Sequence, residues 1–156
     1  MASFCQQRRQ RYPEAIVTSC RRTQCDLKLQ NWQPADLAIL DLDRFHASYQ
    51  GLFAVDRRAD FVLAFCEDGL HVLTIEMKTG RPKHAPAGQL EATLTALDRL
   101  LGSQNVDSLR LLILHRGIRS TDLNFLRRCK VPFRGRKYGI YVKPCGSAIG
   151  EVLRLP

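Results

Sequence analysis

Two apolar segments in the middle of the chain predict a β-hairpin. Residues 59–66 and 70–78 are rich in Phe, Val, Leu and Ile, and the Asp-Gly pair between them is typical of a turn. A three-residue loop with Gly69 in the left-handed conformation places Cys66 opposite Leu70. A two-residue loop would shift the register by one position and turn the side chains of one strand to the other face. Because Gly69 suits the longer loop, we expect the three-residue form.

The hydrophobic pattern elsewhere predicts a sheet covered by helices. Leucines recur at three- and four-residue steps between Pro86 and Gly102, which predicts a helix. Residues 110–117 are apolar on both faces of the expected strand, as in the centre of a covered sheet. Ser120 is a candidate N-cap for a short helix that follows. The other expected strands are residues 37–43, 131–133 and 138–143.

These elements fit a single α/β domain. The first 35 residues carry many Arg and Gln residues and two prolines, so we expect helix and loop there. No repeat, low-complexity tract or long linker divides the chain of 156 residues. We therefore expect one domain over residues 1–156, a sandwich of helices around a mixed sheet, with its core at about residues 37–143.

Positive charge is in excess. The chain has 24 Lys and Arg residues against 15 Asp and Glu residues, a formal net charge of +9, which suits a polyanion such as nucleic acid. A merely soluble basic protein would show the same excess. Residues 127–137 concentrate cations around Phe133, an arrangement suited to phosphate contacts and base stacking, although a solvated charged edge strand would look the same. The candidate nucleic-acid-binding residues are Arg127, Arg128, Lys130, Arg134, Arg136 and Lys137.

The six cysteines predict reduced thiols in a cytoplasmic protein. The first residues are polar and basic, with no apolar region of the secretory kind. No pair has the CxxC spacing of a structural zinc site, so we expect neither zinc nor an iron-sulfur cluster. No apolar run approaches the ~20 residues of a membrane span, so a soluble protein without a membrane partner is expected.

Three charges stand at the far end of the hairpin. In the expected register Asp60 lies opposite Glu76, with Lys78 on the same face and the two acidic Cβ atoms roughly 5 Å apart. Like charges placed in this way repel each other. Either Lys78 offsets the repulsion as an ion pair, or a divalent cation does. Mg²⁺ suits two carboxylates on fixed strands, and the backbone carbonyl of Met77 would be a natural further ligand.

These residues resemble the signature of the PD-(D/E)XK nuclease superfamily. Fifteen residues lie between Asp60 and Glu76, and residues 75–78 read IEMK, the hydrophobic-Glu-x-Lys order of the motif. A helix bearing Gln89 follows, which looks like the exonuclease-type and Holliday-junction-resolvase-like branches. Ala59 stands where the named motif has Pro. The likeness covers about residues 59–116.

The resemblance implies a restriction-endonuclease-like fold and a set of roles. Asp60 and Glu76 would bind Mg²⁺, for which Mn²⁺ can substitute, and Lys78 would position or activate the attacking water and stabilise negative charge. Gln89 would orient the substrate or the lysine. Many members also carry an upstream acidic or histidine residue, and the sequence selects none of its candidates. These are Glu14, Asp36, Asp41, Asp43 and His46.

The leading hypothesis is a metal-dependent nuclease that hydrolyses phosphodiester bonds in DNA. The alternative is a non-catalytic nucleic-acid-binding or assembly subunit that retains the nuclease fold. A protein-interaction module is a third, weaker reading. Members with intact signatures also work inside larger assemblies, so the expected states include a homodimer and a larger nucleic-acid-processing complex. DNA or RNA, and endonuclease or exonuclease, stay open at this point.

Overall fold

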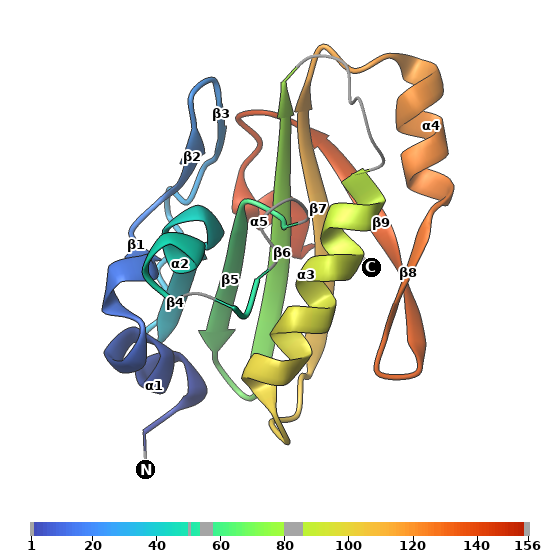
Figure 1. The fold of residues 1–156 in the computed structure, drawn as a ribbon. Helices are drawn as coiled ribbons and strands as arrows, with labels where there is room; N and C mark the ends of the chain where they lie inside the picture. Colours follow the sequence, from blue (N-terminus) through green and yellow to red (C-terminus); the bar gives the residue numbers. More distant parts are fainter. Residues whose placement is uncertain (1, 50, 54–57, 80–85, 155–156) are drawn as a thin grey trace.

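The computed structural model describes residues 2–49, 51–53, 58–79 and 86–154 (Figure 1). Its strands are β1 (Ile16–Val17), β2 (Cys20–Arg22), β3 (Cys25–Leu27), β4 (Leu37–Asp41), β5 (Phe61–Cys66), β6 (Leu70–Thr79), β7 (Ser108–Arg116), β8 (Lys130–Phe133) and β9 (Arg136–Pro144). Its helices are α1 (Phe4–Arg11), α2 (Leu42–Ser48), α3 (Pro86–Leu101), α4 (Ser120–Arg128) and α5 (Ile149–Leu153), with a 3₁₀ turn, η1 (Pro13–Ala15).

A mixed sheet of seven strands forms the centre of the molecule, in the order β1-β4-β5-β6-β7-β9-β8. Strands β6, β7 and β9 are parallel, and the other neighbours are antiparallel. A separate two-stranded sheet pairs β2 with β3. The expected mixed α/β architecture with helices around a central sheet is therefore confirmed, and the finer assignment to a nuclease fold is taken up below.

The β5–β6 hairpin has the expected register. Cys66 lies opposite Leu70 and Phe61 opposite Ile75, as the three-residue loop requires. Gly69 has φ +119°, a backbone conformation that residues with a side chain rarely adopt. A Cβ at this position would also overlap the side chain of Asp107. Both constraints explain why a glycine ends this loop.

Different elements pack on the two faces of the sheet. Val62 and Leu111 pack in one cluster with residues of α1, α2, α3 and α4. Leu63 and Leu112 point the other way and pack with residues of β2, β3 and α5. Because side chains alternate along a strand, the even-numbered residues of β6 lie on the α3 side, and this places the charged end of β6 on that side too.

Helix α3 and strand β7 also follow the predicted pattern. Helix α3 buries Leu90, Leu94 and Leu97 and ends before Gly102, which has φ +59°. Strand β7 lies between β6 and β9 and is buried on both faces through its middle. Among the described residues, no helix has both the length and the apolar character needed to cross a membrane.

Three expectations about local structure and thiols are wrong. The first 35 residues contain strands β1, β2 and β3 besides helix, because two- and three-residue strands leave no periodic pattern to detect. Ser120 is the first helical residue of α4 and not its N-cap, which is Arg119. Cys25 and Cys145 form a disulfide, whereas all thiols were expected to be reduced. These two cysteines are 120 positions apart, so the sequence gives no sign that β3 and the end of β9 meet.

Candidate active site

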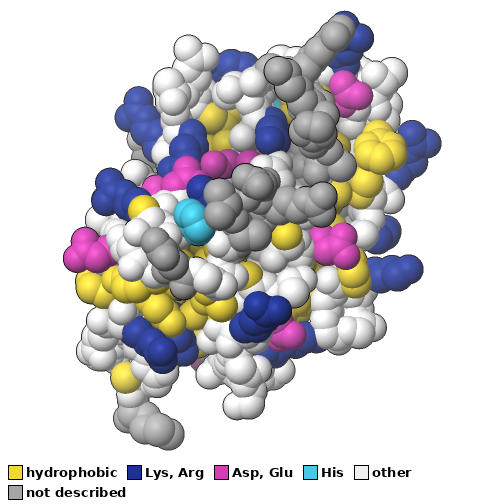
Figure 2. Space-filling view, in the orientation of Figure 1, with side chains coloured by type: hydrophobic (Ala, Val, Ile, Leu, Met, Phe, Trp, Pro, Cys, Tyr) yellow, Lys and Arg dark blue, Asp and Glu magenta, His cyan; other side chains and the backbone are white. Residues whose placement is uncertain are grey.

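The residues expected to form a metal site line one pocket at the C-terminal end of β6. Its volume is about 260 Å³. Asp60 lies just before β5, Glu76 and Lys78 come from β6, and Gln89 comes from the first turn of α3. Figure 2 shows acidic side chains gathered beside α2 with Lys and Arg side chains around them. The described residues that line it are Asp43, Arg58, Asp60, Glu76, Met77, Lys78 and Gln89.

Asp60 is held in place by its own hydrogen bonds. Its Oδ2 accepts from the backbone N–H of Met77 at 2.7 Å, and its Oδ1 accepts from Nε of Arg22 at 3.1 Å. Its backbone N–H donates to the carbonyl of Ile75, and its carbonyl accepts from the N–H of Leu42. The side chain of Asp60 therefore satisfies a β6 amide just past the end of the regular β5–β6 ladder, which fixes its carboxylate against β6.

Glu76 is a buried acid next to this carboxylate. Only 3% of Glu76 is exposed, and its Oε2 has no hydrogen-bond partner in the described part of the chain. Burial, and then a hydrogen bond to Asp60 and repulsion from its charge, raise the pKa of Glu76 to about 10, while Lys78 opposes this rise. Without a further cation, Glu76 therefore keeps a proton at neutral pH.

This donor set fits a divalent cation. A divalent cation bound between Asp60 and Glu76 would replace the proton of Glu76. It would also give Oε2 of Glu76, which lacks a partner among the described residues, an ion to bind. Two carboxylates with room for water in a polar pocket match the preference of Mg²⁺ for a few hard oxygen ligands.

No protein-family model, curated protein or solved structure matches this chain.

Arg22 is the main residue that the sequence did not indicate. It comes from β2, and its guanidinium contacts three carboxylates. Two nitrogens donate to Asp41 at 2.9 and 3.0 Å, a third donates to Asp60, and one also lies 3.2 Å from Asp43. The guanidinium stacks over the ring of Phe61 at 4.3 Å. This cation therefore joins the upstream acids to the predicted metal ligand.

The structure distinguishes between the upstream candidates. Asp43 alone among them lines the pocket. Asp41 caps α2 by accepting from two backbone amides and binds Arg22; burial raises the pKa of Asp41, but these hydrogen bonds outweigh burial and leave it lowered. Asp36 pairs with Arg9 at the other end of β4. Glu14 and His46 make contacts outside the pocket.

A buried threonine of α3 supports the segment before Asp60. Oγ1 of Thr93 accepts from the N–H of Ala59 at 2.7 Å and donates to the carbonyl of Gln89 at 2.7 Å. The side chain of Gln89 reaches the carbonyl of Arg58 at 3.5 Å, a weak contact. The guanidinium of Arg58 lies 2.9 Å from Asp43. Helix α3 thus positions the pocket wall, although Arg58 and Thr93 carry no sequence signal of this role.

The disulfide is attached to the strand paired with Arg22. Arg22 and Cys25 are cross-strand partners in the β2–β3 hairpin, and Cys25 is bonded to Cys145 just after β9. The hairpin is also tied to this region through the backbone of Lys28, which donates to Ser147. The position of the site's main cation therefore depends on a covalent link between distant parts of the chain.

The β8–β9 end of the predicted nucleic-acid-binding segment lies away from the pocket. Strands β6, β7 and β9 are parallel, and Lys78, His115 and Pro144 are at one level of the sheet. Arg136 begins β9 eight residues earlier, so about 26 Å separates it from that level at ~3.3 Å per residue. The other exposed cations lie along the chain from the end of α4 to the β8–β9 hairpin; they are Arg127, Arg128, Lys130 and Lys137. Arg127 is nearer to the pocket end of the sheet, because burial and then the charge of Arg127 lower the pKa of His115, the neighbour of Lys78 in the sheet.

Arg134 and Phe133 have structural contacts instead of free surfaces. Arg134 bonds Asp98 at 2.6 Å and donates to the carbonyls of Gly102 and Gln104, so it caps the C-terminal end of α3. Phe133, expected to stack on a base, is 6% exposed and packs in the core. The exposed aromatic ring near the basic segment is that of Phe125 in α4.

Proposed function

We propose that this protein is a metal-dependent nuclease of the PD-(D/E)XK type, with a restriction-endonuclease-like fold, that hydrolyses phosphodiester bonds in DNA. One observation carries the proposal. Asp60 and Glu76 converge in a polar pocket on the face that also carries Lys78, and one oxygen of the buried Glu76 has no hydrogen-bond partner among the described residues. A buried acid with an oxygen that lacks a hydrogen bond is costly in a purely structural role.

Each residue of the pocket then has a chemical role. Asp60 and Glu76 would hold Mg²⁺ or Mn²⁺, with the backbone carbonyl of Met77 as a further ligand. The ion would lower the pKa of a water molecule and stabilise charge on the phosphate. Lys78, a cation on the same face, favours the negative charge that develops on the phosphate oxygens and orients the attacking water. Gln89 and the first turn of α3 form the wall against which the substrate would lie.

The charge distribution supports a polyanionic substrate. The chain carries a net charge of +9 although several acids gather at the pocket, so the rest of the surface is more strongly basic. Arg136 lies about 26 Å from the level of Lys78 along β9, a distance covered by ~8 base pairs of duplex at 3.4 Å per step. A duplex of at least this length would be needed to contact both the pocket and the basic hairpin.

A non-catalytic nucleic-acid-binding subunit is the second candidate, and Arg22 favours it. With Glu76 protonated, the described residues in and around the pocket include three carboxylates and four cations, so the carboxylates are offset without a metal ion. The seven groups are Asp41, Asp43, Asp60, Arg22, Arg44, Arg58 and Lys78. Such an ion-pair cluster would suffice for a structural role.

The test separates these two candidates. Plasmid and oligonucleotide DNA are incubated with the parent, with Lys78→Ala and with Lys28→Ala, whose lysine is exposed outside the pocket. Mg²⁺ and Mn²⁺ should support cleavage by the parent and by Lys28→Ala, and Lys78→Ala should lose roughly 10²–10³-fold in rate. Metal binding, followed by calorimetry, should persist in Lys78→Ala.

A lack of both cleavage and metal binding would contradict the nuclease proposal. If the pure parent cuts neither DNA form with either ion, and neither ion raises its melting temperature, the pocket is a structural ion-pair cluster. Retained DNA binding would then support the binding-subunit candidate.

A further inference from the structure

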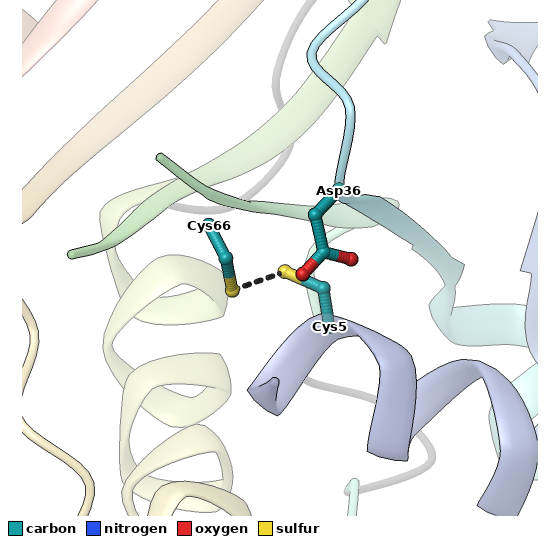
Figure 3. A group of neighbouring side chains, drawn as sticks. All are labelled: Cys5, Asp36 and Cys66. Carbon is teal, nitrogen blue, oxygen red and sulfur yellow. Dashed lines mark hydrogen bonds between the residues drawn. The ribbon is translucent and has the colours of Figure 1, made fainter. Parts of the chain in front are cut away.

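Two thiols meet at the other end of β5, away from the pocket (Figure 3). The Sγ atoms of Cys5 in α1 and Cys66 in β5 are 2.8 Å apart. Cys5 is fully buried and its thiol also reaches the carbonyl of Ala64, whereas Cys66 is partly exposed. The carboxylate of Asp36 lies within 4.8 Å of both sulfurs. Nothing in the proposed nuclease site uses these groups.

The short sulfur–sulfur distance favours a covalent bond over a metal site. Zinc bonds to sulfur at about 2.3 Å, so two sulfurs on one tetrahedral ion lie about 3.8 Å apart, well beyond the spacing of Cys5 and Cys66. The spacing is also below the ~3.5 Å of ordinary nonbonded contacts and approaches the ~2.05 Å of a disulfide. Two neighbouring elements, α1 and β5, already hold the sulfurs this close.

The charges around the thiols also disfavour a metal ion. Arg9 bonds the carboxylate of Asp36 at 2.8 Å and donates to the carbonyl of Leu37 at 2.6 Å. The only nearby carboxylate in the group is thus already neutralised by a fixed cation, which a divalent ion would have to approach. A disulfide carries no charge and meets no such opposition.

We propose that Cys5 and Cys66 are an oxidative modification site that forms a second disulfide when the protein meets a small-molecule disulfide such as oxidised glutathione. Cys66, the more exposed thiol, loses its proton to solvent and attacks one sulfur of the reagent, which breaks its S–S bond and releases one reduced thiol. Cys5 then attacks Sγ of Cys66, and its proton passes to the reagent thiolate that leaves. The mixed disulfide breaks and the second reduced thiol leaves, so two protein thiols are oxidised and one reagent disulfide is reduced to two thiols.

Burial supports this order of events. Loss of solvent, and then the contact with Cys66, raise the pKa of the Cys5 thiol well above its usual range, so Cys5 is a poor first nucleophile. Once Cys66 has formed a mixed disulfide with the reagent, the thiol of Cys5 lies next to that bond. The new bond would join α1 to β5 across a sequence separation of 61 positions and restrict the unfolded chain.

The experiment uses the full chain with its Cys25–Cys145 bond intact. Parent protein is incubated with oxidised glutathione, alkylated and mapped by peptide mass spectrometry, with Cys129→Ser as control because Cys129 is the other partly exposed free thiol. We expect a Cys5–Cys66 cross-linked peptide, a fall from four free thiols to two, and a rise in melting temperature of roughly 5–10 °C. Cys129→Ser should form the same cross-link, and Cys66→Ser should form none.

Two results would overturn the proposal. One is a stable glutathione adduct on Cys66 with Cys5 still open to alkylation after unfolding. The other is binding of one equivalent of Zn²⁺ that is lost in Cys66→Ser and that blocks oxidation, since this would make the group a metal site. Neither outcome bears on nuclease activity, which depends on other residues.

Discussion

Replacing Glu76 with Gln should remove a pH dependence from the stability of the metal-free protein. In the folded state the pKa of Glu76 is raised to about 10, against an ordinary value of 4.5. The folded protein therefore holds one more proton than the unfolded chain between these two values. The contribution of this proton to the free energy of unfolding is complete below about pH 4.5 and is lost as the pH rises toward 10.

The slope follows from linkage and depends little on the exact folded pKa. One extra bound proton in the folded state lowers the free energy of unfolding by about 1.4 kcal/mol for each pH unit. From pH 6 to pH 8 the parent should therefore lose about 2.7 kcal/mol that Glu76→Gln keeps, because Gln resembles the protonated acid and does not titrate. Urea unfolding in EDTA at both pH values measures the difference.

The control lies in the same hairpin. Glu67 is exposed in the loop, so Glu67→Gln should keep the pH slope of the parent. Excess Mg²⁺ at pH 8 should restore stability to the parent and leave Glu76→Gln unchanged, because only the parent can exchange the proton for the ion. If Glu76→Gln and the parent show the same pH slope in EDTA, then Glu76 is ionised in the folded protein, and the conclusion that it keeps a proton at neutral pH is wrong.

The remaining predictions concern the groups around the pocket. Arg22→Met should cost about 3 kcal/mol in urea unfolding, because the buried Asp41 loses its partner, and should tighten Mg²⁺ binding in calorimetry, because a competing cation is gone. Cys145→Ser should cost about 2–4 kcal/mol by the same unfolding assay, which a reducing agent should reproduce in the parent. Arg136→Ala with Lys137→Ala should flatten the salt dependence of DNA binding by a slope of about 2 with little change in melting temperature. Arg134→Ala should instead lower the melting temperature, since Arg134 caps α3.

The parts of the fold that the sequence predicts are those determined by local pattern. The hairpin register depended on one glycine and its three-residue loop, and the α3 stripe depended on leucines one turn apart. The buried strand β7 was visible as an unbroken apolar run. From these, the convergence of Asp60 and Glu76 could be predicted before any coordinates, because a fixed register determines which side chains share a face.

The parts that escaped prediction depend on contacts between distant segments. Arg22 lies in a three-residue strand with no periodicity, and it reaches Asp60 only because the hairpin of β2 and β3 folds over the sheet. Cys25 and Cys145 have an uninformative spacing for the same reason. Arg134 looked like one more cation in a basic segment, and its role became clear only from the carbonyls at the end of α3. Composition counts charges but does not show which of them are already paired.

Arg22 also bears on how a metal ion would enter the pocket. Its two bonds to Asp41 form a bidentate pair, whereas a single bond at 3.1 Å joins it to Oδ1 of Asp60. An ion approaching Asp60 therefore competes with the weaker of these contacts, and Arg22 can stay on Asp41 when Asp60 changes partner. Arg22 would then lie beside the ion and keep its contact with Asp43. Under the proposed function, the ion-pair cluster and the metal site would be two charge states of one arrangement, and the proton of Glu76 would decide between them.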